Sequence, residues 1–452
     1  VGAAVVSGFP IHEGSPVRHP GPPPAQADVV VLGGGILGVM TAWFLAERGL
    51  SVVVCEKGRV AGEQSSRNWG WIRQQGRDPV ELPIMIEANR IWRTLEAETG
   101  TDLGFRQSGV LYLANGPKDM AGFEAWMVHA RAHGLDTRLL TAANVQAMLP
   151  NAARWTGGLW TASDCKAEPW KAVPAIAAAL GQRGCVIREG CAVRALDVAA
   201  GRVAGVVTET GRIAASRVVL AGGAWSSLFL RRHGVALPQL SVKATVAQTA
   251  PLPQMFEGGA ADNHFAIRRR QDGGYTLAPG GFHEFYIGPD AFRAFRAFLP
   301  QLRKDMPHTR FYPAAPSGYP DAWGTARHWA EDAKTPFERM RILNPAPNMG
   351  EVGRLQDRFA RAFPAVGRPP VRLAWAGMID TMPDVVPVID HVAALPGLWL
   401  LTGLSGHGFG IGPGGRRVMA DRVMGRAPGH DLSRFRLSRF SDGARIEIGP
   451  SL

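Results

Sequence analysis

Cysteine and lysine are both scarce in this chain of 452 residues. Its four cysteines are too few for a disulfide framework in a chain of this length, and their spacing matches no metal site. Only seven of its 50 basic residues are lysines, and the arginines are spread along the whole chain. Because nucleic-acid binders concentrate basic and aromatic residues in one stripe, the net charge of +12 does not predict a nucleic-acid partner.

Long uninterrupted apolar runs are also missing. A membrane-spanning helix needs roughly 18 or more consecutive apolar residues, and no segment provides them. The apolar stretch 395–415 is interrupted by Pro396 and by glycines, which favours a buried loop system. Residues 1–6 are small and apolar and fit either the remnant of a signal segment or a plain chain end.

The composition that remains is that of a large folded protein. Apolar residues make up 46% and charged residues 19%, and the chain is about three times the length of a typical domain. Two closely joined domains are therefore expected. A proline-rich stretch at 16–24 predicts that residues 1–27 form a tail or linker.

The first clear pattern is a βαβ unit close to the N-terminus. Residues 27–32 are apolar and β-branched and predict a buried parallel strand. Residues 39–48 then predict a helix that ends at Gly49, and residues 50–55 predict a second strand. A parallel strand pair joined by a helix is the framework of nucleotide-binding domains.

The turn inside this unit carries Gly33, Gly35 and Gly38 in the spacing G-x-G-x-x-G, and Glu56 ends the second strand. Glycines at these positions permit a tight turn and bring the helix N-terminus close to a pyrophosphate. Glu56 can accept hydrogen bonds from ribose hydroxyls and would repel a 2′-phosphate. The unit therefore predicts a dinucleotide-binding site.

The rest of the chain alternates between helix and strand signals. Helices are predicted at 83–99, 174–179 and 415–424. Strands are predicted at 185–188, 192–198, 203–208, 217–221, 372–375 and 398–402. Residues 238–365 differ, with short strands, turns and aromatic helices, which indicates a second domain inserted between pieces of the first.

Five motifs then identify a family resemblance. They are Ala61–Gly70 (AGEQSSRNWG), Asp164–Pro169, Leu220–Ser226 (LAGGAWS), Thr381–Asp384 (TMPD) and Thr402–Gly408 (TGLSGHG). Because it carries these motifs in this order, the sequence resembles the D-amino-acid-oxidase-like superfamily of flavoproteins. Further segments resemble its bacterial membrane-associated L-amino acid deaminases and related L-amino acid oxidases, namely 218–229, 272–275, 278–279, 334–338 and 363–364.

The resemblance and the element pattern together predict an α/β protein. Its Rossmann-like FAD-binding domain, of the glutathione-reductase type, is expected in three pieces, 28–100, 166–237 and 369–432. An inserted α+β substrate domain on a mixed, largely antiparallel sheet is expected at 101–165 and 238–368. Residues 433–452 are expected to form a C-terminal tail.

The resemblance implies noncovalent FAD, because Gly377 stands where sarcosine oxidases carry the cysteine that attaches the flavin. The residues expected to bind it are Gly33, Gly35, Ile36, Leu37, Gly38, Glu56, Lys57, Gln64, Ser65, Ser66, Asn68, Trp69, Gly70, Trp71, Ala192, Val193, Gly222, Gly223, Trp225, Gly377, Gly406, His407, Gly408, Phe409 and Gly410.

The implied reaction is oxidative deamination of an L-amino acid to a keto acid and ammonia, by hydride transfer from Cα to the flavin. The substrate carboxylate needs a cation, and a planar arginine fork suits it best. Arg268 matches the carboxylate-binding arginine of the L-amino acid deaminases. Strand alternation directs Arg268 and Arg270 to one face and Arg269 to the other. A solvated basic strand end is the alternative interpretation for all three arginines.

Other candidate residues have two readings each. His407 either contacts the flavin edge or the pocket, or only packs in its loop, and Trp69 and Trp71 either wall the pocket or fill core. Gln75, with its neighbour Gln74, is close enough in sequence to the flavin loop to reach substrate. The three residues predicted to act in catalysis are Arg268, His407 and Gln75.

Several alternatives stay open. The substrate is an L-amino acid or, on the same fold, a D-amino acid or an N-methyl amine, and the electron acceptor is O₂ or a membrane quinone. A flavin-containing binding or assembly subunit is the rival from another class. Residues 290–304 form either a basic amphipathic helix on a membrane or a helix packed on the domain core. The location is therefore cytoplasmic or peripheral to the bacterial inner membrane.

Overall fold

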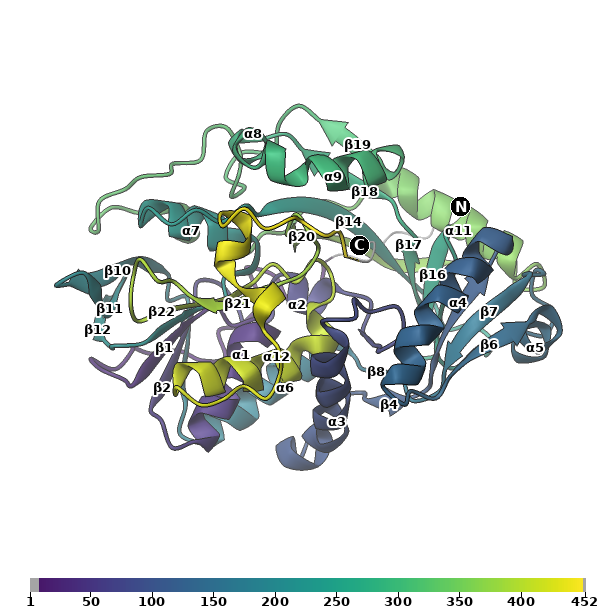
Figure 1. The fold of residues 1–452 in the computed structure, drawn as a ribbon, viewed down its shortest axis with the longest axis horizontal. Helices are drawn as coiled ribbons and strands as arrows, with labels where there is room; N and C mark the ends of the chain where they lie inside the picture. The colour runs from purple at the N-terminus through teal and green to yellow at the C-terminus, as the bar shows by residue number, and fades with distance from the viewer. Residues whose placement is uncertain (1–7, 450–452) are drawn as a thin grey trace.

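The computed structural model describes residues 8–449, so the signal remnant considered for residues 1–6 lies outside the described residues. Two large sheets dominate the structure (Figure 1). The first has six strands in the order β21-β22-β13-β1-β2-β9, parallel throughout except for the pair β21–β22. Their bounds are β1 Val29–Leu32, β2 Val52–Glu56, β9 Val186–Glu189, β13 Val218–Leu220, β21 Val388–His391 and β22 Leu398–Thr402.

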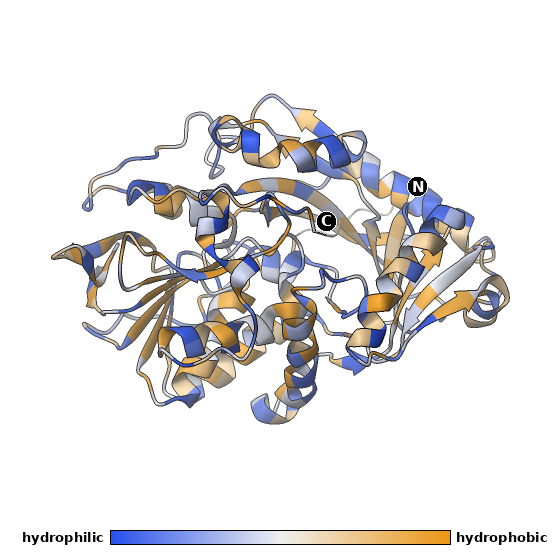
Figure 2. Ribbon diagram, in the orientation of Figure 1, coloured by the Kyte–Doolittle hydropathy of each residue, from blue (hydrophilic) through white to orange (hydrophobic). Residues whose placement is uncertain are grey.

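Alternation along the strands of this sheet builds two separate apolar layers. Val29 and Val31 of β1 pack with helices on one face, whereas Val30 and Leu32 pack on the other face. The helices of the first layer are α1 Ile36–Glu47, α3 Leu82–Thr99, α6 Pro169–Gln182 and α12 Gly408–Val423. On the second face lie β10 Val193–Ala199, β11 Arg202–Thr208, β12 Gly211–Ala214 and α7 Ser226–Arg232. Burial on both faces explains the continuous hydrophobic colour of these strands in Figure 2.

The second sheet has ten strands and is mixed but largely antiparallel. Among the strand pairs of this sheet within residues 8–449, only β15–β5 and β18–β19 are parallel. The strands are β5 Val110–Ala114, β6 Thr137–Thr141, β7 Gly157–Thr161, β14 Leu240–Thr249, β15 Gly259–Ala261, β16 Phe265–Arg269, β17 Tyr275–Pro279, β18 His283–Tyr286, β19 Thr309–Tyr312 and β20 Val371–Thr381. The predicted fold class is confirmed, whereas the residue boundaries of the two domains stay a prediction.

Shorter elements connect the two large sheets and cover them. A small sheet joins β3 Trp71–Ile72, β8 Cys165–Lys166 and β4 Arg106–Gln107. Helices on or beside the ten-stranded sheet are α4 Pro117–Ala132, α5 Ala142–Met148, α8 Pro289–Arg293, α9 Phe295–Asp305 and α11 Met349–Ala362. The remaining elements are α2 Gln64–Arg67, α10 Pro336–Arg339, and the 3₁₀ turns η1 Gly223–Trp225, η2 Met306–His308, η3 Ser433–Phe435 and η4 Leu437–Phe440.

The prediction of a loop up to residue 415 was wrong in its second half, because α12 begins at Gly408. Glycine is a poor helix former, yet here it permits close packing. A Cβ on Gly414 would clash with the carbonyl oxygen of Ile84 in α3. Tertiary contact with α1 and α3 therefore overrides the low helix propensity of this segment.

Three further expectations about single elements need correction. The helix expected at 290–304 is divided at Ala294 into α8 and α9. The strand expected at 372–375 extends over the whole of β20 and pairs antiparallel with β14, not with the nucleotide-binding strands. Helix α6 also begins earlier than predicted, at Pro169.

Both segments expected to be tails are packed against the protein where the structure describes them. Phe9 is buried with Trp170 and Trp375, at centroid separations of 5.6 Å from each. Near the other end, Arg439 of η4 donates to both carboxylate oxygens of Asp384, at 2.8 and 3.0 Å. These contacts add buried surface that the proline-rich sequence did not predict.

Candidate functional site

A cavity of about 490 Å³ lies where the carboxyl ends of β1, β2 and β13 meet the ten-stranded sheet. Ligands of open α/β sheets bind at this edge, where loops from several strands converge. From the nucleotide-binding side the cavity is lined by the β1–α1 turn, the end of β2 and residues 61–77. From the other side it is lined by residues of β5, α4, β14 and β20.

The β1–α1 turn has the backbone geometry that a diphosphate cradle requires. Gly33 has φ of +112°, and a Cβ there would clash with the carbonyl oxygen of Ala221. A Cβ on Gly38 would clash with the carbonyl oxygen of Gly33. Gly35 leaves only 2.8 Å between a built Cβ and Ser65 Oγ. The three glycines of the motif are thus each required by close approach, and the turn presents backbone rather than side chains to the cavity.

Glu56 at the end of β2 holds the turn and lines the cavity. Its two carboxylate oxygens accept from the backbone N–H groups of Gly34 and Gly58, both at 2.7 Å. Burial raises the pKa of Glu56 to about 7, although Lys57 and these two N–H groups oppose the shift. A half-buried carboxylate that lines the cavity in this position fits the adenosine ribose of a bound dinucleotide.

Most residues predicted to bind the cofactor line this one cavity. Those that do are Gly33, Gly35, Ile36, Leu37, Glu56, Lys57, Gln64, Ser65, Asn68, Trp69, Trp71, Val193, Gly222, Gly223, Trp225, Gly377, Gly406, His407, Gly408, Phe409 and Gly410. Gly38, Ser66, Gly70 and Ala192 lie outside the lining. Of these four, Gly38 serves the helix packing described above, and Ser66 donates to the carbonyl of Ala61 at 2.5 Å.

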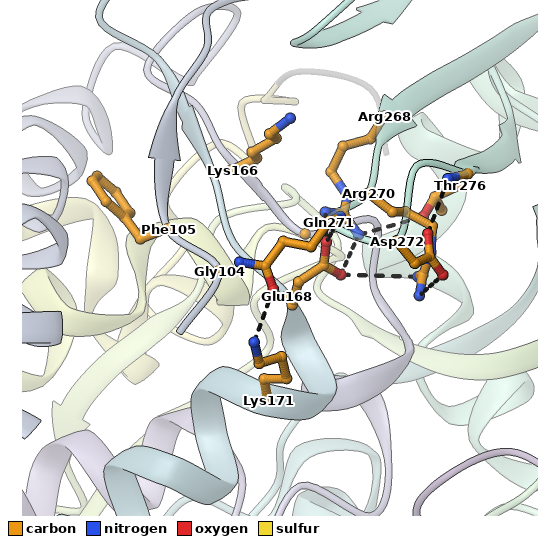
Figure 3. A network of polar contacts seen from close by, with 12 residues as sticks. Gly104, Phe105, Lys166, Glu168, Lys171, Arg268, Arg270, Gln271, Asp272 and Thr276 are labelled. Atoms are coloured by element: carbon orange, nitrogen blue, oxygen red, sulfur yellow. Dashed lines mark hydrogen bonds and ion pairs between the residues drawn. The ribbon is translucent and has the colours of Figure 1, made fainter. Parts of the chain in front are cut away.

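The structure pairs Arg268, the residue predicted to bind a substrate carboxylate, with a carboxylate of the protein itself. Its guanidinium donates to both oxygens of Glu168, at 2.9 and 3.0 Å, and Arg268 is outside the lining of the cavity (Figure 3). Burial alone would raise the pKa of Glu168, but Arg268 holds it at about 2. Strand alternation correctly grouped Arg268 with Arg270, and it did not reveal that Glu168, at the N-terminus of α6, faces both.

Gln75 is likewise not brought to the cavity. Its amide oxygen accepts from Thr161 Oγ1 at 2.8 Å, and the residue is fully buried. Arg269 pairs instead with Glu257, at 3.6 Å. Of the three residues predicted to act in catalysis, only His407 lines the cavity.

Four arginines that the sequence analysis did not name as site residues line the cavity: Arg59, Arg67, Arg73 and Arg77. Arg73 and Arg77 follow β3, and the Arg73 guanidinium lies 5.7 Å from the ring centroid of Tyr112. Arg77 Nη2 donates to the carbonyl oxygen of His407 at 3.3 Å. Burial, together with the charge of Arg73, lowers the pKa of Arg77 to about 10. Arg73 and Arg77 are four residues apart and closely follow the motif Ala61–Gly70, and this position was the sequence signal that could have predicted them.

The apolar part of the cavity is aromatic. Trp69 and Trp71 both line it and meet edge to face at 5.4 Å. Tyr112, Phe123 and Phe282 extend this wall. The arrangement combines a glycine turn suited to a diphosphate, several cationic side chains and an aromatic wall in one continuous space.

His407 and Glu81 form a buried polar cluster at the cavity wall. His407 Nδ1 lies 3.9 Å from Glu81 Oε2, and Arg77 Nη1 lies 3.8 Å from the same oxygen. Within residues 8–449, neither ring nitrogen of His407 and neither carboxylate oxygen of Glu81 has a hydrogen-bond partner. Burial raises the pKa of Glu81 to about 7 and lowers the pKa of His407 well below its usual value.

A βαβ unit with a glycine turn, an acidic residue after its second strand and a cavity at the carboxyl edge of the sheet define a dinucleotide-binding enzyme fold. The chain belongs to the FAD dependent oxidoreductase family, which it matches over residues 28–422. It is therefore an FAD-dependent flavoenzyme, and the cradle and the ribose acceptor described above fit that cofactor.

Three known proteins illustrate the similarity. The structure of L-amino acid deaminase from Proteus myxofaciens in complex with anthranilate is 31% identical, with a TM-score of 0.89, over 94% of this chain and 96% of that one. Sarcosine oxidase subunit beta of Rhizobium meliloti is 26% identical over 438 residues, covering 95% of this chain and 92% of the relative. Human mitochondrial sarcosine dehydrogenase is 29% identical over 270 residues, so the match spans 58% of this chain but only 29% of that protein.

Proposed function

We propose that this protein oxidises L-amino acids to keto acids and ammonia. The observation that carries the proposal is the pair Arg73 and Arg77 in the same cavity as the glycine turn and an aromatic wall. The similarity to an L-amino acid deaminase over nearly the whole chain supports the L-amino acid class. The rival is oxidation of N-methyl amino acids, which the similarity to sarcosine-oxidising proteins supports.

In this proposal FAD is held noncovalently by the lining residues described above. The diphosphate rests on the turn from Gly33 to Leu37, and Glu56 accepts from the adenosine ribose. When bound, FAD supplies the acceptor for the hydride that leaves the substrate Cα. The protein's part is then to bind the substrate, orient it and exclude water from it.

The substrate carboxylate is held by the two arginines. A planar guanidinium offers two parallel N–H donors that match a carboxylate, so an arginine pair gives orientation as well as charge. Arg77 is buried and anchored on the His407 carbonyl, whereas Arg73 stacks beside Tyr112. The aromatic residues Trp69, Trp71 and Phe282 then favour an apolar or aromatic substrate side chain.

Anaerobic reduction of the bound flavin tests the proposal. The holoenzyme is mixed with each enantiomer of several amino acids, with sarcosine and with dimethylglycine, and flavin bleaching is followed. We expect reduction by L-amino acids with apolar side chains. Reduction by D-amino acids or N-methyl amines alone would overturn the proposal, and reduction by none of them would favour a flavin-containing binding subunit.

Substitution of the arginines checks the carboxylate anchor. Arg73→Ala and Arg77→Ala should each lower kcat/KM by about 10- to 150-fold, equivalent to about 1.5–3 kcal/mol for a hydrogen bond to a charged group. Arg269→Ala is the matched control, because Arg269 is a neighbouring-domain arginine paired with Glu257 outside the cavity. Equal losses in all three variants would contradict the assignment.

We also propose that the face around α8 and α9 rests on a membrane, where a quinone is available as electron acceptor. Five of the nine large exposed hydrophobic residues of the described chain gather here: Phe292, Phe295, Met306, Phe311 and Trp323. Arg293, Arg296 and Arg303 lie between them, and α8 and α9 occupy the upper edge of the view in Figure 1. Apolar side chains among cations suit the interface of an anionic bilayer. No helix among residues 8–449 is long and apolar enough to span one.

Flotation with lipid vesicles tests this surface. The holoenzyme should float with vesicles that contain an anionic lipid, and Phe292→Ser with Phe295→Ser should reduce flotation. Val128→Ser is the control, because Val128 on α4 is 63% exposed, close to the 66% of Phe292. Unchanged flotation of the double variant, or no flotation of the unmodified protein, would contradict the proposal. A parallel assay with a soluble quinone and with O₂ identifies the acceptor.

A further inference from the structure

A long connection, residues 313–348, joins β19 to α11 (Figure 1). Within it, the segment 336–343, which begins with α10, reaches the nucleotide-binding half of the cavity and is named the strap. Its side chains Phe337 and Ile342 line the cavity together with Glu56. The Phe337 ring meets that of Trp225, another lining residue, edge to face at 5.7 Å. The end of the cavity assigned to adenosine is therefore walled in part by the strap.

The strap packs directly on the loop that follows β2. A Cβ built on Gly58 would lie 2.1 Å from the carbonyl oxygen of Arg341, and a Cβ on Gly62 would lie 3.0 Å from Ile342 Cδ1. At Gly58 the neighbouring group is backbone, so no side chain could move aside to make room. The two segments are thus fitted to each other.

Two charged residues of that loop hold the backbone of the strap. Lys57 Nζ donates to the carbonyl oxygens of Met340 and Arg341, at 3.0 and 2.9 Å, and pairs with Glu63 at 2.7 Å. Glu63 in turn accepts from the backbone N–H of Leu343 at 2.9 Å. Hydrogen bonds to charged groups are stronger than neutral ones, so these contacts favour the closed position of the strap.

Arg341 fastens the strap from the outside. Its guanidinium donates to both carboxylate oxygens of Glu209, at 2.5 and 2.6 Å, and to the carbonyl oxygen of Lys57 at 3.0 Å. Glu209 also accepts from the backbone N–H of Ala192 at 2.7 Å, so its carboxylate keeps a partner if Arg341 is removed. Arg341 is outside the lining of the cavity, whereas its neighbour Ile342 belongs to it.

We propose that the strap covers the adenosine end of the FAD site and has to open before the cofactor can enter or leave. In this arrangement Phe337 and Ile342 contact the cofactor, and Arg341 is a positioning residue that keeps the strap closed. The inference concerns FAD alone and is independent of the substrate that the enzyme oxidises.

The proposal has a kinetic signature. Opening breaks the contacts of Lys57, Glu63 and Arg341 together, so the open form is a minor population of the folded protein. The rate constants of FAD entry and of FAD release both scale with that population. A residue that only touches the cofactor acts differently, because its loss speeds release and leaves entry unchanged.

The first test measures both rate constants for Arg341→Ala. Association of FAD with the FAD-free full-length chain is followed by quenching of flavin fluorescence, and release from the holoenzyme by its recovery on dilution. Both rate constants should rise about tenfold or more, the effect of losing a hydrogen bond to a charged group, while their ratio changes much less. Arg341→Lys should be intermediate, because it keeps the charge and loses the planar fork. Ile342→Ala should speed release alone.

The second test follows the strap itself. Backbone hydrogen exchange in peptides that cover 336–343 should be slower in the holoenzyme than in the FAD-free chain, because coupling between strap closure and FAD binding is reciprocal. Arg341→Ala should speed this exchange. Far-UV circular dichroism and recovery of full flavin content on adding FAD establish that the chains compared are folded.

Arg212→Ala is the matched control. Arg212 pairs at 2.8 Å with Glu331 of the same connection, and it is exposed and outside the cavity. Its removal should leave both rate constants unchanged. Faster release without faster entry in Arg341→Ala, equal effects in Arg212→Ala, or exchange of the strap that does not respond to FAD would each overturn the proposal.

Discussion

Two buried glutamates of this protein, each close to two arginines, differ in almost every other respect. Glu168 accepts two hydrogen bonds from Arg268 and one from the backbone of Gln271, at 3.0 Å. Glu81 has no hydrogen-bond partner among residues 8–449, and its nearest cation is 3.8 Å away. Accordingly the pKa of Glu168 is lowered to about 2, whereas that of Glu81 is raised to about 7.

This difference in hydrogen bonding distinguishes a charged side chain that stabilises the fold from one that is available for function. A carboxylate whose lone pairs are satisfied inside the protein has little left to offer a ligand, and it stabilises the contact between α6 and the ten-stranded sheet. A buried carboxylate without partners is unfavourable in the folded state, and carboxylates with such raised pKa values cluster at functional sites of proteins. Glu81 borders the cavity wall and Glu168 does not, in agreement with this distinction.

Among the substitutions predicted to change stability, disruption of the ion pair between Arg268 and Glu168 should lower the free energy of unfolding the most. Arg268→Ala leaves Glu168 buried without its main partner, and we expect a loss of about 3–5 kcal/mol in the free energy of unfolding. Urea unfolding of the holoenzyme measures it. The double variant Arg268→Met with Glu168→Leu should be more stable than Arg268→Ala. A variant Arg268→Ala that keeps its stability but loses affinity for carboxylate ligands would restore the original assignment of Arg268.

Glu56 extends the comparison, because it is a half-buried carboxylate whose partners are backbone N–H groups rather than arginines. Glu56→Ala should weaken FAD binding by about 1.5–3 kcal/mol through loss of a charged acceptor for the ribose. Fluorescence titration of the apoprotein with FAD gives the dissociation constant. Unchanged affinity would argue against the proposed seat of the adenosine ribose.

The contributions of Glu81 and Glu168 to the free energy of unfolding should change with pH in opposite directions. The folded-state pKa of Glu81 lies above its ordinary value of 4.5, so its contribution to the free energy of unfolding falls as pH rises from about 4.5 to about 7. Glu81→Gln should therefore stabilise the protein by about 1–3 kcal/mol at pH 8 and by less at pH 5. For Glu168 the folded-state pKa is lowered, so its stabilisation is present above pH 4.5 and is lost as pH falls toward about 2.

Thermal unfolding of Glu81→Gln and Glu168→Gln at several pH values checks this prediction. Glu168→Gln should be destabilised at neutral pH, and the difference from the unmodified protein should shrink in acid. Parallel curves for the two variants would contradict the contrast between a satisfied and an unsatisfied carboxylate.

The smallest effect is expected at Arg416, the cationic counterpart of Glu81. Arg416 of α12 is fully buried, and none of its three guanidinium nitrogens has a hydrogen-bond partner in the described chain. Burial lowers its pKa well below the usual value. Arg416→Met should raise the free energy of unfolding by about 1–2 kcal/mol, because an apolar side chain of similar length avoids the desolvation cost. Destabilisation only in the presence of FAD would instead indicate a contact with the cofactor.

The nucleotide-binding half of the site was predictable because its signals are local. The turn from Gly33 to Gly38 lies between a strand and a helix that both follow from short sequence windows, and Glu56 follows the next strand. Close backbone approach requires glycine at Gly33 and Gly38, and a Cβ on Gly35 would crowd Ser65 Oγ, so the motif can be recognised without knowledge of the rest of the fold. The cavity lining agrees with most of the residues predicted from it.

The residues of the proposed substrate-binding half were harder to predict from the sequence, because they come together only through tertiary packing. Arg268 and Arg73 carry the same guanidinium, and no local pattern distinguishes them. Glu168 neutralises the first from a position 100 residues away in the chain. The pairing of His407 with Glu81 also joins distant segments, the N-termini of α12 and α3.

The sequence by itself determined the fold class, the dinucleotide cradle and the family, because these depend on strand and helix periodicity and on glycines that no other residue can replace. The tertiary structure alone decided which charged side chains face the cavity. The availability of a charged side chain to a ligand depends on its tertiary surroundings, because a guanidinium that is already paired with a carboxylate of the protein has few donors left for a ligand. That outcome depends on how α6, α3 and α12 pack against the two sheets, which short sequence windows do not encode.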